Sequence, residues 1–253
     1  MEAQNSLTAL VTNASDFAGP PAVEALVAAD VRVLVNDKAF ADPAAWSRFS
    51  LAHPRAERIE ASDPAALIAM AWDIAGRVDA IVSNDHYPAI HKASDQASLD
   101  DLRRTLEALV VAPFAAMKAA IPRLKAQGGG NVVMITSCRT NLPMPGGAIP
   151  DAARAGANAL VRSLAIELAP FEIAVNAVAP NFLYSEAYYP RALFIDDPGG
   201  RAYVEAAVPA KRLGRPDEIG EVIRFLATTK ARFLTGAIID FAGGWPASPV
   251  RPG

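Results

Sequence analysis

The chain has 253 residues, of which 52% are hydrophobic, and this is enough apolar surface for one large core. The formal net charge is −3 and the basic residues are dispersed, which argues against nucleic acid or an anionic membrane as the partner. The single cysteine, Cys138, excludes an intrachain disulfide. The three histidines, His53, His86 and His91, lack metal-ligand spacing and are expected in solvated loops, so no metal site is predicted.

The sequence also bears on localisation. The segment MEAQNSLTALV has no basic region followed by a long apolar run, so no secretory signal is predicted there. No stretch reaches the roughly 18 uninterrupted apolar residues that a membrane span needs. We therefore expect a cytoplasmic protein without a membrane partner.

Strand-like apolar runs alternate with helical patterns along the chain, which predicts βαβ units around a parallel sheet. The predicted strands are residues 7–11, 31–36, 79–84, 131–137, 173–180 and 235–244, with a weaker one at 56–61. The predicted helices are residues 21–29, 64–76, 99–126, 150–169 and 216–227. Because no repeat or linker interrupts the alternation, residues 1–253 are predicted to form a single α/β domain with a doubly wound, Rossmann-like parallel sheet.

Two stretches interrupt the alternation. Residues 139–150 are rich in Pro and Gly, and residues 181–213 are far longer than a structural connection needs. Both follow the carboxyl ends of predicted strands, which is the edge where open parallel sheets bind ligands. Long loops in compact domains are usually functional, so residues 181–213 are predicted to form a substrate or lid loop.

The turn after the first predicted strand, TNASDFAG (12–19), is where a nucleotide-binding fold places its dinucleotide. That turn needs glycines so that the pyrophosphate can approach the backbone. Here only Gly19 remains, and Phe17 fills a place where a bare backbone is needed. Asp37, after the second strand, is interpreted as a turn residue and not as a ribose ligand. The sequence therefore predicts no nicotinamide cofactor.

Further motifs follow in a fixed order along the chain. They are VSND (82–85), ITSC (135–138), ARAGANALVRSLAIELAP (153–170), IAVNAVAPNF (173–182), RLGRPDEIGEVIRFLAT (212–228) and FLTGAIIDFAGGW (233–245). Together they resemble the short-chain dehydrogenase/reductase superfamily over essentially the full length. The resemblance identifies Ser137 with the superfamily's catalytic serine and the 153–170 segment with the helix that follows its catalytic tyrosine.

Phe17, the segment FAGPPAVEAL and the VSND motif resemble one group of this superfamily, the halohydrin dehalogenases. The resemblance implies a cofactor-independent lyase that closes vicinal haloalcohols to epoxides, releasing halide, or opens epoxides with small anions. It also implies that the halide is bound partly by backbone N–H groups in the loop after the sixth strand. Transferred to this chain, that loop comprises Pro180, Asn181, Phe182 and Leu183. The pocket walls are expected to be apolar and to include Phe17, Pro88, Leu142, Phe182 and Tyr188.

The dehalogenase group uses a Ser-Tyr-Arg triad, and this chain retains only part of it. Ser137 and Arg154 stand at the serine and arginine positions, but Pro150 stands four residues before the arginine, where the tyrosine belongs. In the group, the serine orients the substrate oxygen, the tyrosine accepts its proton and the arginine lowers the pKa of the tyrosine. An additional asparagine of the group is replaced here near Leu109. The resemblance therefore implies a dehalogenase with altered or impaired chemistry.

Three interpretations remain open. In the first, another residue supplies the base; the candidates are Tyr87, Tyr184, Tyr188, Tyr189 and Asp151. Each also has a plainer interpretation, because loop tyrosines often line pockets and Asp151 at a helix start interacts well with the helix dipole. In the second, the pocket only binds a small ligand. In the third, which is ranked last, the chain is an atypical NAD(P)-dependent oxidoreductase despite Asn13, Phe17 and Pro150.

The resemblance also implies partners. These are a small-molecule substrate, a halide or other small anion, and further copies of the chain in a homo-oligomer, with a tetramer expected. The segment LEALVVAPFAAMKAAI, within 99–126, is apolar nearly all round, which suits an interface helix. The Pro-rich tail, residues 246–253, is expected to fray or to reach a neighbouring pocket.

Overall fold

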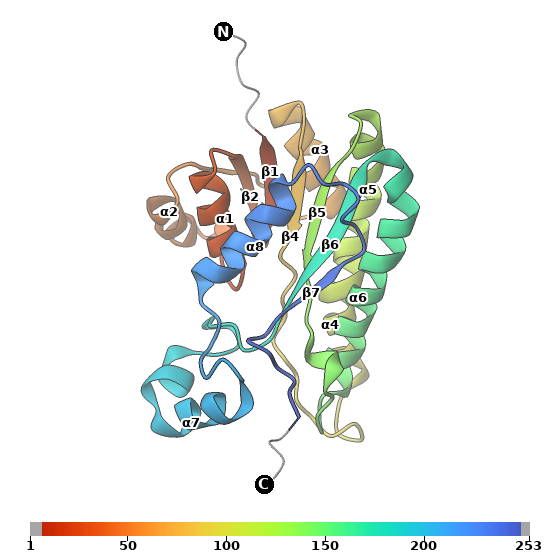
Figure 1. Ribbon diagram of the computed structural model, residues 1–253. Helices are drawn as coiled ribbons and strands as arrows, with labels where there is room; N and C mark the ends of the chain where they lie inside the picture. The colour runs from red at the N-terminus through yellow and green to blue at the C-terminus, as the bar shows by residue number, and fades with distance from the viewer. Residues whose placement is uncertain (1–6, 249–253) are drawn as a thin grey trace.

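The computed structural model describes residues 7–248, and the last five residues of the predicted tail lie outside that range (Figure 1). Its centre is a seven-stranded sheet with the order β3-β2-β1-β4-β5-β6-β7, in which every neighbouring pair is parallel. The strands are β1 (Thr8–Thr12), β2 (Arg32–Asn36), β3 (Ala56–Arg58), β4 (Ala80–Ser83), β5 (Gly130–Ile135), β6 (Ile173–Pro180) and β7 (Ile238–Phe241). The strand order reverses between β1 and β4, so the predicted doubly wound, Rossmann-like fold is confirmed.

Helices cover both faces of the sheet (Figure 1). One face carries α1 (Gly19–Ala28), α2 (Pro43–Ala52) and α8 (Pro216–Thr228). The other carries α3 (Pro64–Ala75), α4 (Leu99–Leu106), α5 (Ala112–Ala126) and α6 (Ala148–Leu168). The last helix, α7 (Pro198–Ala207), lies beyond the carboxyl ends of the strands, below the sheet in the view of Figure 1.

Alternate side chains of each central strand enter two separate cores. In β1, Ala9 and Val11 pack with the α1 and α8 side, whereas Leu10 packs with the α3 and α5 side. Because both faces are buried, the strands are continuous apolar runs and not polar–apolar alternations. This explains why the sequence predicts each strand, although the predicted ends differ from those in the structure by a few residues. The predicted strand 131–137 ends at Ile135, so Thr136 and Ser137 lie just past the sheet.

Two helices were not predicted. Helix α2 begins at Pro43 after Asp42, whose side chain accepts a hydrogen bond from the Ala44 N–H. Helix α7 begins in the same way, with Pro198 following the N-cap Asp197. Aspartate is favourable at the N-cap and proline at the first helical position, so the Asp-Pro pairs in the sequence could have predicted where both helices start. The predicted 181–213 loop is therefore not one irregular segment, because it contains α7 and the π-turn Ala192–Asp196.

The predicted helix 99–126 is continuous but contains a π-helical turn, Glu107–Val111, between α4 and α5. By length and composition alone, this stretch is long and apolar enough to cross a membrane. In the fold it packs against α3 and α6 as part of the layer over the sheet. Val111 and Phe114 remain about half exposed on its outer side, where the predicted tetramer would bury them.

The turn between β1 and α1 is closely packed at its last residue. A Cβ atom added to Gly19 would lie 2.5 Å from the Ala14 carbonyl oxygen. That oxygen belongs to the backbone, so it cannot move away as the end of a side chain could. Gly19 is thus required by the close approach of the turn to the start of α1.

We expect Gly19→Ala to lower the free energy of unfolding by about 1–3 kcal/mol, the usual cost of forcing extra atoms into a packed site. Chemical denaturation of the purified variant measures this difference. Gly156→Ala in α6 is the matched control, because its added Cβ would meet only a Val110 methyl group at 3.3 Å. Equal effects of the two substitutions would contradict this account of the turn.

Candidate functional site

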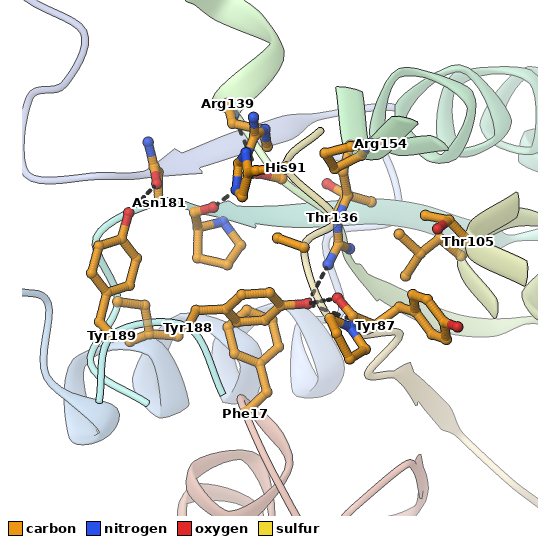
Figure 2. Close-up of a pocket in the computed structure, with 17 residues that line it drawn as sticks. Phe17, Tyr87, His91, Thr105, Thr136, Arg139, Arg154, Asn181, Tyr188 and Tyr189 are labelled. Atoms are coloured by element: carbon orange, nitrogen blue, oxygen red, sulfur yellow. Dashed lines mark hydrogen bonds between the residues drawn. The ribbon is translucent and has the colours of Figure 1, made fainter. Parts of the chain in front are cut away.

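A cavity of about 140 Å³ opens at the carboxyl ends of the strands, which is close to the size of a cavity known to hold benzene. It lies between the ends of β5 and β6, the first turn of α6 and the segment after β6 (Figure 2). Its lining residues are Phe17, Tyr87, Pro88, Ala89, His91, Thr105, Leu109, Thr136, Ser137, Arg139, Pro150, Arg154, Pro180, Asn181, Leu183, Tyr188 and Tyr189. All three triad positions therefore line one pocket: Ser137, Arg154 and the position where Pro150 replaces the tyrosine.

The Tyr188 hydroxyl meets the Arg154 guanidinium inside this cavity (Figure 2). The Nη2 atom of Arg154 donates to the Tyr188 oxygen over 3.2 Å. The same oxygen accepts from the Tyr87 N–H at 3.1 Å and donates to the Tyr87 carbonyl at 2.7 Å. Three hydrogen bonds thus fix the phenol beside a permanent cation, although the two residues come from distant parts of the chain.

Arg154 is 5% exposed and carries its charge into the protein interior. Within residues 7–248, its side chain donates only to neutral oxygen atoms, namely the carbonyls of Asp85 and Ile135 and the Tyr188 hydroxyl. No carboxylate among these residues bonds to it directly, and the nearby Asp85 carboxyl, whose pKa burial raises to about 7, offsets the cost of this buried charge only in part. The pocket therefore favours a bound ligand that brings a negative charge beside Arg154.

Ser137 is held at the same cavity by its neighbours. Its hydroxyl donates to the Pro180 carbonyl at 3.2 Å and accepts from the Arg139 N–H at 3.2 Å. Asn158, one turn after Arg154 on α6, donates to the Ser137 carbonyl at 3.0 Å. The adjacent Thr136 hydroxyl is buried and has no hydrogen-bond partner among the described residues. The cavity thus holds two hydroxyl groups that a ligand oxygen could contact.

Pro150 lies in the first turn of α6, buried against the cavity. Proline suits this turn because its missing N–H would be unpaired there in any case. Leu109, at the π-turn after α4, also lines the pocket and supplies only apolar surface. The α6 side of the cavity therefore provides Arg154 but no proton acceptor.

Three of the other four candidate bases, Tyr184, Tyr189 and Asp151, are engaged with other residues. Tyr184 does not line this cavity, and its hydroxyl donates to Glu186, which raises its pKa. Tyr189 lines the cavity but donates to Asn181 Oδ1 at 2.8 Å, and burial raises its pKa. Asp151 forms an ion pair with Arg139. Tyr87 lines the pocket, and its backbone groups hold the Tyr188 hydroxyl.

Phe17 covers one side of the cavity as predicted. Its ring packs edge-on against the Tyr188 ring, with 4.9 Å between centroids. Its φ of 56°, like the 48° of Asn13, lies in the left-handed region that favours glycine. The turn thus keeps a glycine-type backbone at two positions that now carry side chains. The Asn13 side chain donates to Asp85 at 3.4 Å, and Asn84 donates to the carbonyls of Asn13 and Asp16.

The residues of this turn do not fit the pyrophosphate of a dinucleotide cofactor. The Ser15 N–H donates to the Asp37 carboxylate at 2.9 Å, and the Phe17 N–H donates to its neighbour Asp16 at 2.6 Å. Backbone N–H groups that could bind a phosphate are therefore already paired with carboxylates, which also repel an anion. Asp37 accepts in addition from the Ala39 N–H, so its interpretation as a turn residue agrees with the structure.

Several predicted site residues lie elsewhere. Leu142 is 55% exposed and does not line the cavity, because it lies in the exposed segment 141–145. Phe182 is buried away from the cavity, in an aromatic cluster with Tyr189, Tyr203 and Trp245. Pro88, a predicted wall residue, lines the cavity, as do Pro180, Asn181 and Leu183 of the predicted halide-binding loop.

The cysteine and histidines also have defined places. Cys138 is a buried core residue, and burial raises the pKa of its thiol to about 12. His53 is buried against Phe49, so its predicted place in a solvated loop was wrong. Within residues 7–248, no cluster of three or more His, Cys, Asp or Glu side chains could hold a metal ion.

Three further polar residues of the site were not singled out in the sequence: Arg139, His91 and Asp85. Arg139 follows Ser137 by two residues, and His91 follows the VSND motif, so both come shortly after strand ends. Their position after strand ends was the only feature of the sequence that could have indicated a place in the site. It was not sufficient, because many side chains after strands point away from the cavity.

Asp85 closes the VSND motif and is fully buried. Its carboxylate accepts from Ser83 Oγ at 2.7 Å, while its backbone carbonyl accepts from Arg154. Burial raises the pKa of this carboxyl to about 7, and the Ser83 hydrogen bond and the Arg154 charge only partly offset that effect. In the unfolded chain the same group ionises near about pH 4. The cost of ionising it in the folded protein therefore develops as the pH rises from about 4 to 7 and stays constant above.

We expect Asp85→Asn to raise the free energy of unfolding at pH 8 by up to about 4 kcal/mol, because the amide keeps the shape without the buried charge. The gain should shrink as the pH is lowered through 7 towards 5, and denaturation at a series of pH values measures it. Asp95→Asn, at an exposed position, is the matched control. A gain that is constant from pH 5 to 8 would contradict the assigned titration.

Comparison with known proteins agrees with the fold. The family model described as enoyl-(acyl carrier protein) reductase matches residues 25–246. The human dehydrogenase/reductase SDR family member 4 is 30% identical over 188 residues, which cover 74% of this chain and 66% of that protein. An uncharacterized oxidoreductase of Methylorubrum extorquens is 31% identical, with 93% of this chain and 96% of that protein covered.

Two solved structures are similar over nearly their whole length. One, described as a dehalogenation enzyme, is 35% identical with a TM-score of 0.91, and the match covers 95% of this chain and 98% of that one. The other, a halohydrin dehalogenase bound to ethyl (2S)-oxiran-2-ylacetate, is 33% identical with a TM-score of 0.93, covering 97% and 100%. The chain therefore belongs to the short-chain dehydrogenase/reductase family.

Proposed function

We propose that this protein is a cofactor-independent lyase that converts vicinal haloalcohols to epoxides and halide, and in the reverse direction opens epoxides with small anions. The hydrogen bond between Tyr188 and Arg154 is the observation that carries the proposal. It places a tyrosine oxygen beside the arginine of the incomplete triad, although Pro150 occupies the usual tyrosine position. Tyr188 is the proposed base.

The chemistry requires one proton transfer and one displacement. The Tyr188 oxygen, as phenolate beside Arg154, accepts the proton of the substrate hydroxyl. The substrate oxygen then attacks the neighbouring carbon, and the carbon–halogen bond breaks with its electron pair leaving on the halide. Ser137 donates to the substrate oxygen once its hydroxyl turns away from the Pro180 carbonyl. A fixed cation beside the oxygen that acquires charge is a favourable arrangement for this step.

The departing halide needs donors at the other side of the substrate. Asn181 and Phe182 have their N–H groups bonded to Phe241 O and to Asn181 Oδ1, so neither is free for an anion. Leu183 lines the cavity, and its N–H has no acceptor among residues 7–248. We therefore assign the halide contact to Leu183. The oxirane in the similar dehalogenase structure supports an epoxide as the product class.

An NAD(P)-dependent reductase is the competing function, and named oxidoreductases among the relatives make it worth testing. The first turn argues against it, because Phe17 fills the space beside Tyr188 and the turn's N–H groups are paired with Asp16 and Asp37.

We expect neither NADH nor NADPH to bind at micromolar concentrations, as measured by calorimetric or fluorescence titration. A coenzyme-dependent reductase of the same family, titrated in parallel, shows that the assay detects binding. Micromolar affinity for either nucleotide would overturn the lyase proposal.

We expect the wild-type chain to release halide from chloro- and bromoalcohols, and Tyr188→Phe to reduce kcat on the order of 10²–10⁴-fold, the usual contribution of a general base. The variant loses only the oxygen bonded to Arg154, so the cavity keeps its shape. Tyr184→Phe is the matched control, because its hydroxyl lies outside the cavity and its removal should leave turnover unchanged.

A second substitution tests the vacant position. Pro150→Tyr in the Tyr188→Phe background should restore part of the lost activity, since it returns a hydroxyl to the α6 side of Arg154. Full wild-type turnover in Tyr188→Phe would remove Tyr188 from the mechanism. A wild-type chain that binds bromide but releases none from any haloalcohol would favour a pocket that only binds ligands.

A further inference from the structure

The cavity has a second cation, Arg139, that the lyase reaction leaves without a role. Arg139 lines the pocket with an 18% exposed side chain, and its Nε–H donates to the Asp151 carboxylate. Figure 2 shows Arg139 and His91 together, apart from the place where the Tyr87, Tyr188 and Arg154 groups meet. The cavity therefore has a polar end besides its reacting end.

The Arg139 charge faces into this polar end. Together with partial burial, it lowers the pKa of His91, which also lines the cavity. Its Nη2 atom lies above Gly147, in the same neighbourhood as the Asp151 carboxylate and the Met144 carbonyl. Apart from the bond to Asp151, the side chain donates to no other acceptor among residues 7–248. Its Nη1 group is thus the part of the guanidinium that is available to a ligand in the cavity.

The remaining charges around Arg139 are few. Asp151 is the one carboxylate bonded to it among the described residues, and partial burial and the arginine charge lower the pKa of His91. His91 is thus neutral at pH 7 and neither repels nor replaces the guanidinium. An arginine already held by one carboxylate keeps a planar edge that suits a second. A pocket for purely apolar haloalcohols would not need such a group at its end.

The size of the cavity limits what can reach both ends. A volume of about 140 Å³ suits a molecule of about three or four carbon atoms with its substituents. A molecule of that length can place a hydroxyl or oxirane oxygen at Tyr188 and one further group at Arg139.

We infer that Arg139 is a specificity-determining residue and that the preferred substrates are short halohydroxy acids or epoxy acids whose carboxylate binds its guanidinium. Only one part of this inference rests on the proposed lyase function, namely that the substrate carries a halohydroxy or epoxide group. Binding of the carboxylate depends only on the polar end of the cavity.

Binding is tested with 3-hydroxybutanoate and its isosteric amide, neither of which can react. By calorimetry, the wild-type chain should bind the carboxylate about 10- to 100-fold more tightly than the amide, as expected for a charge-assisted pair. Arg139→Gln should abolish the preference. Asp151→Asn should strengthen carboxylate binding several-fold, because it removes the anion that competes for Arg139. A gain in binding cannot result from misfolding, so this variant distinguishes a binding role of Arg139 from a structural one.

Turnover gives the second readout. With 4-chloro-3-hydroxybutanoate and its amide, Arg139→Gln should lower kcat/KM for the acid about 10- to 100-fold and leave the neutral 1-chloropropan-2-ol unaffected. Equal binding of acid and amide by the wild-type chain, or an unchanged preference in Arg139→Gln, would overturn the inference. Arg139-dependent carboxylate binding without any halide release would leave it standing and reject the lyase function instead.

Discussion

The buried charge of Arg154 is the constraint on which the site depends. Its guanidinium reaches into the cavity from α6, and only neutral oxygen atoms within the described residues accept from it. Two of these acceptors are backbone carbonyls at the ends of β4 and β5, so the sheet fixes the cation in place. The third is the Tyr188 hydroxyl. A buried cation that bonds directly to no carboxylate stabilises a negative charge that develops beside it, and this is what the proposed reaction requires.

The first turn shows how a phosphate-binding loop becomes a pocket wall. Its backbone keeps left-handed conformations at Asn13 and Phe17, where glycine would be free of strain. Each side chain has contacts that offset this cost: Asn13 with Asp85, and the Phe17 ring with Tyr188. The N–H groups of the turn, meanwhile, are occupied by carboxylates. The same backbone therefore supports a closed, small pocket instead of an extended cofactor groove.

Much of this was predictable from the sequence, and the limits have physical causes. The parallel sheet followed from apolar runs that are buried on both faces, and the vacant tyrosine position at Pro150 followed from the resemblance to the dehalogenase motif. Which hydroxyl lies beside Arg154 could not be predicted, because Tyr188 lies 34 residues away on a segment with no periodic pattern. Leu142 was misplaced for a similar reason: apolar character after a strand does not determine on which side of a turn a residue emerges.

The position of Tyr188 links the chemistry to the packing of the segment after β6. A tyrosine on α6 would be held against Arg154 by the helix itself, since residues four apart share one face. Tyr188 instead depends on the Tyr87 backbone and on the neighbouring aromatic cluster, in which Tyr189 packs against Phe182 and Phe194. The helix α7 contributes Tyr203 to that cluster. The stability of this small lobe therefore determines how well the proposed base is aligned, so residues far from the cavity bear on the reaction.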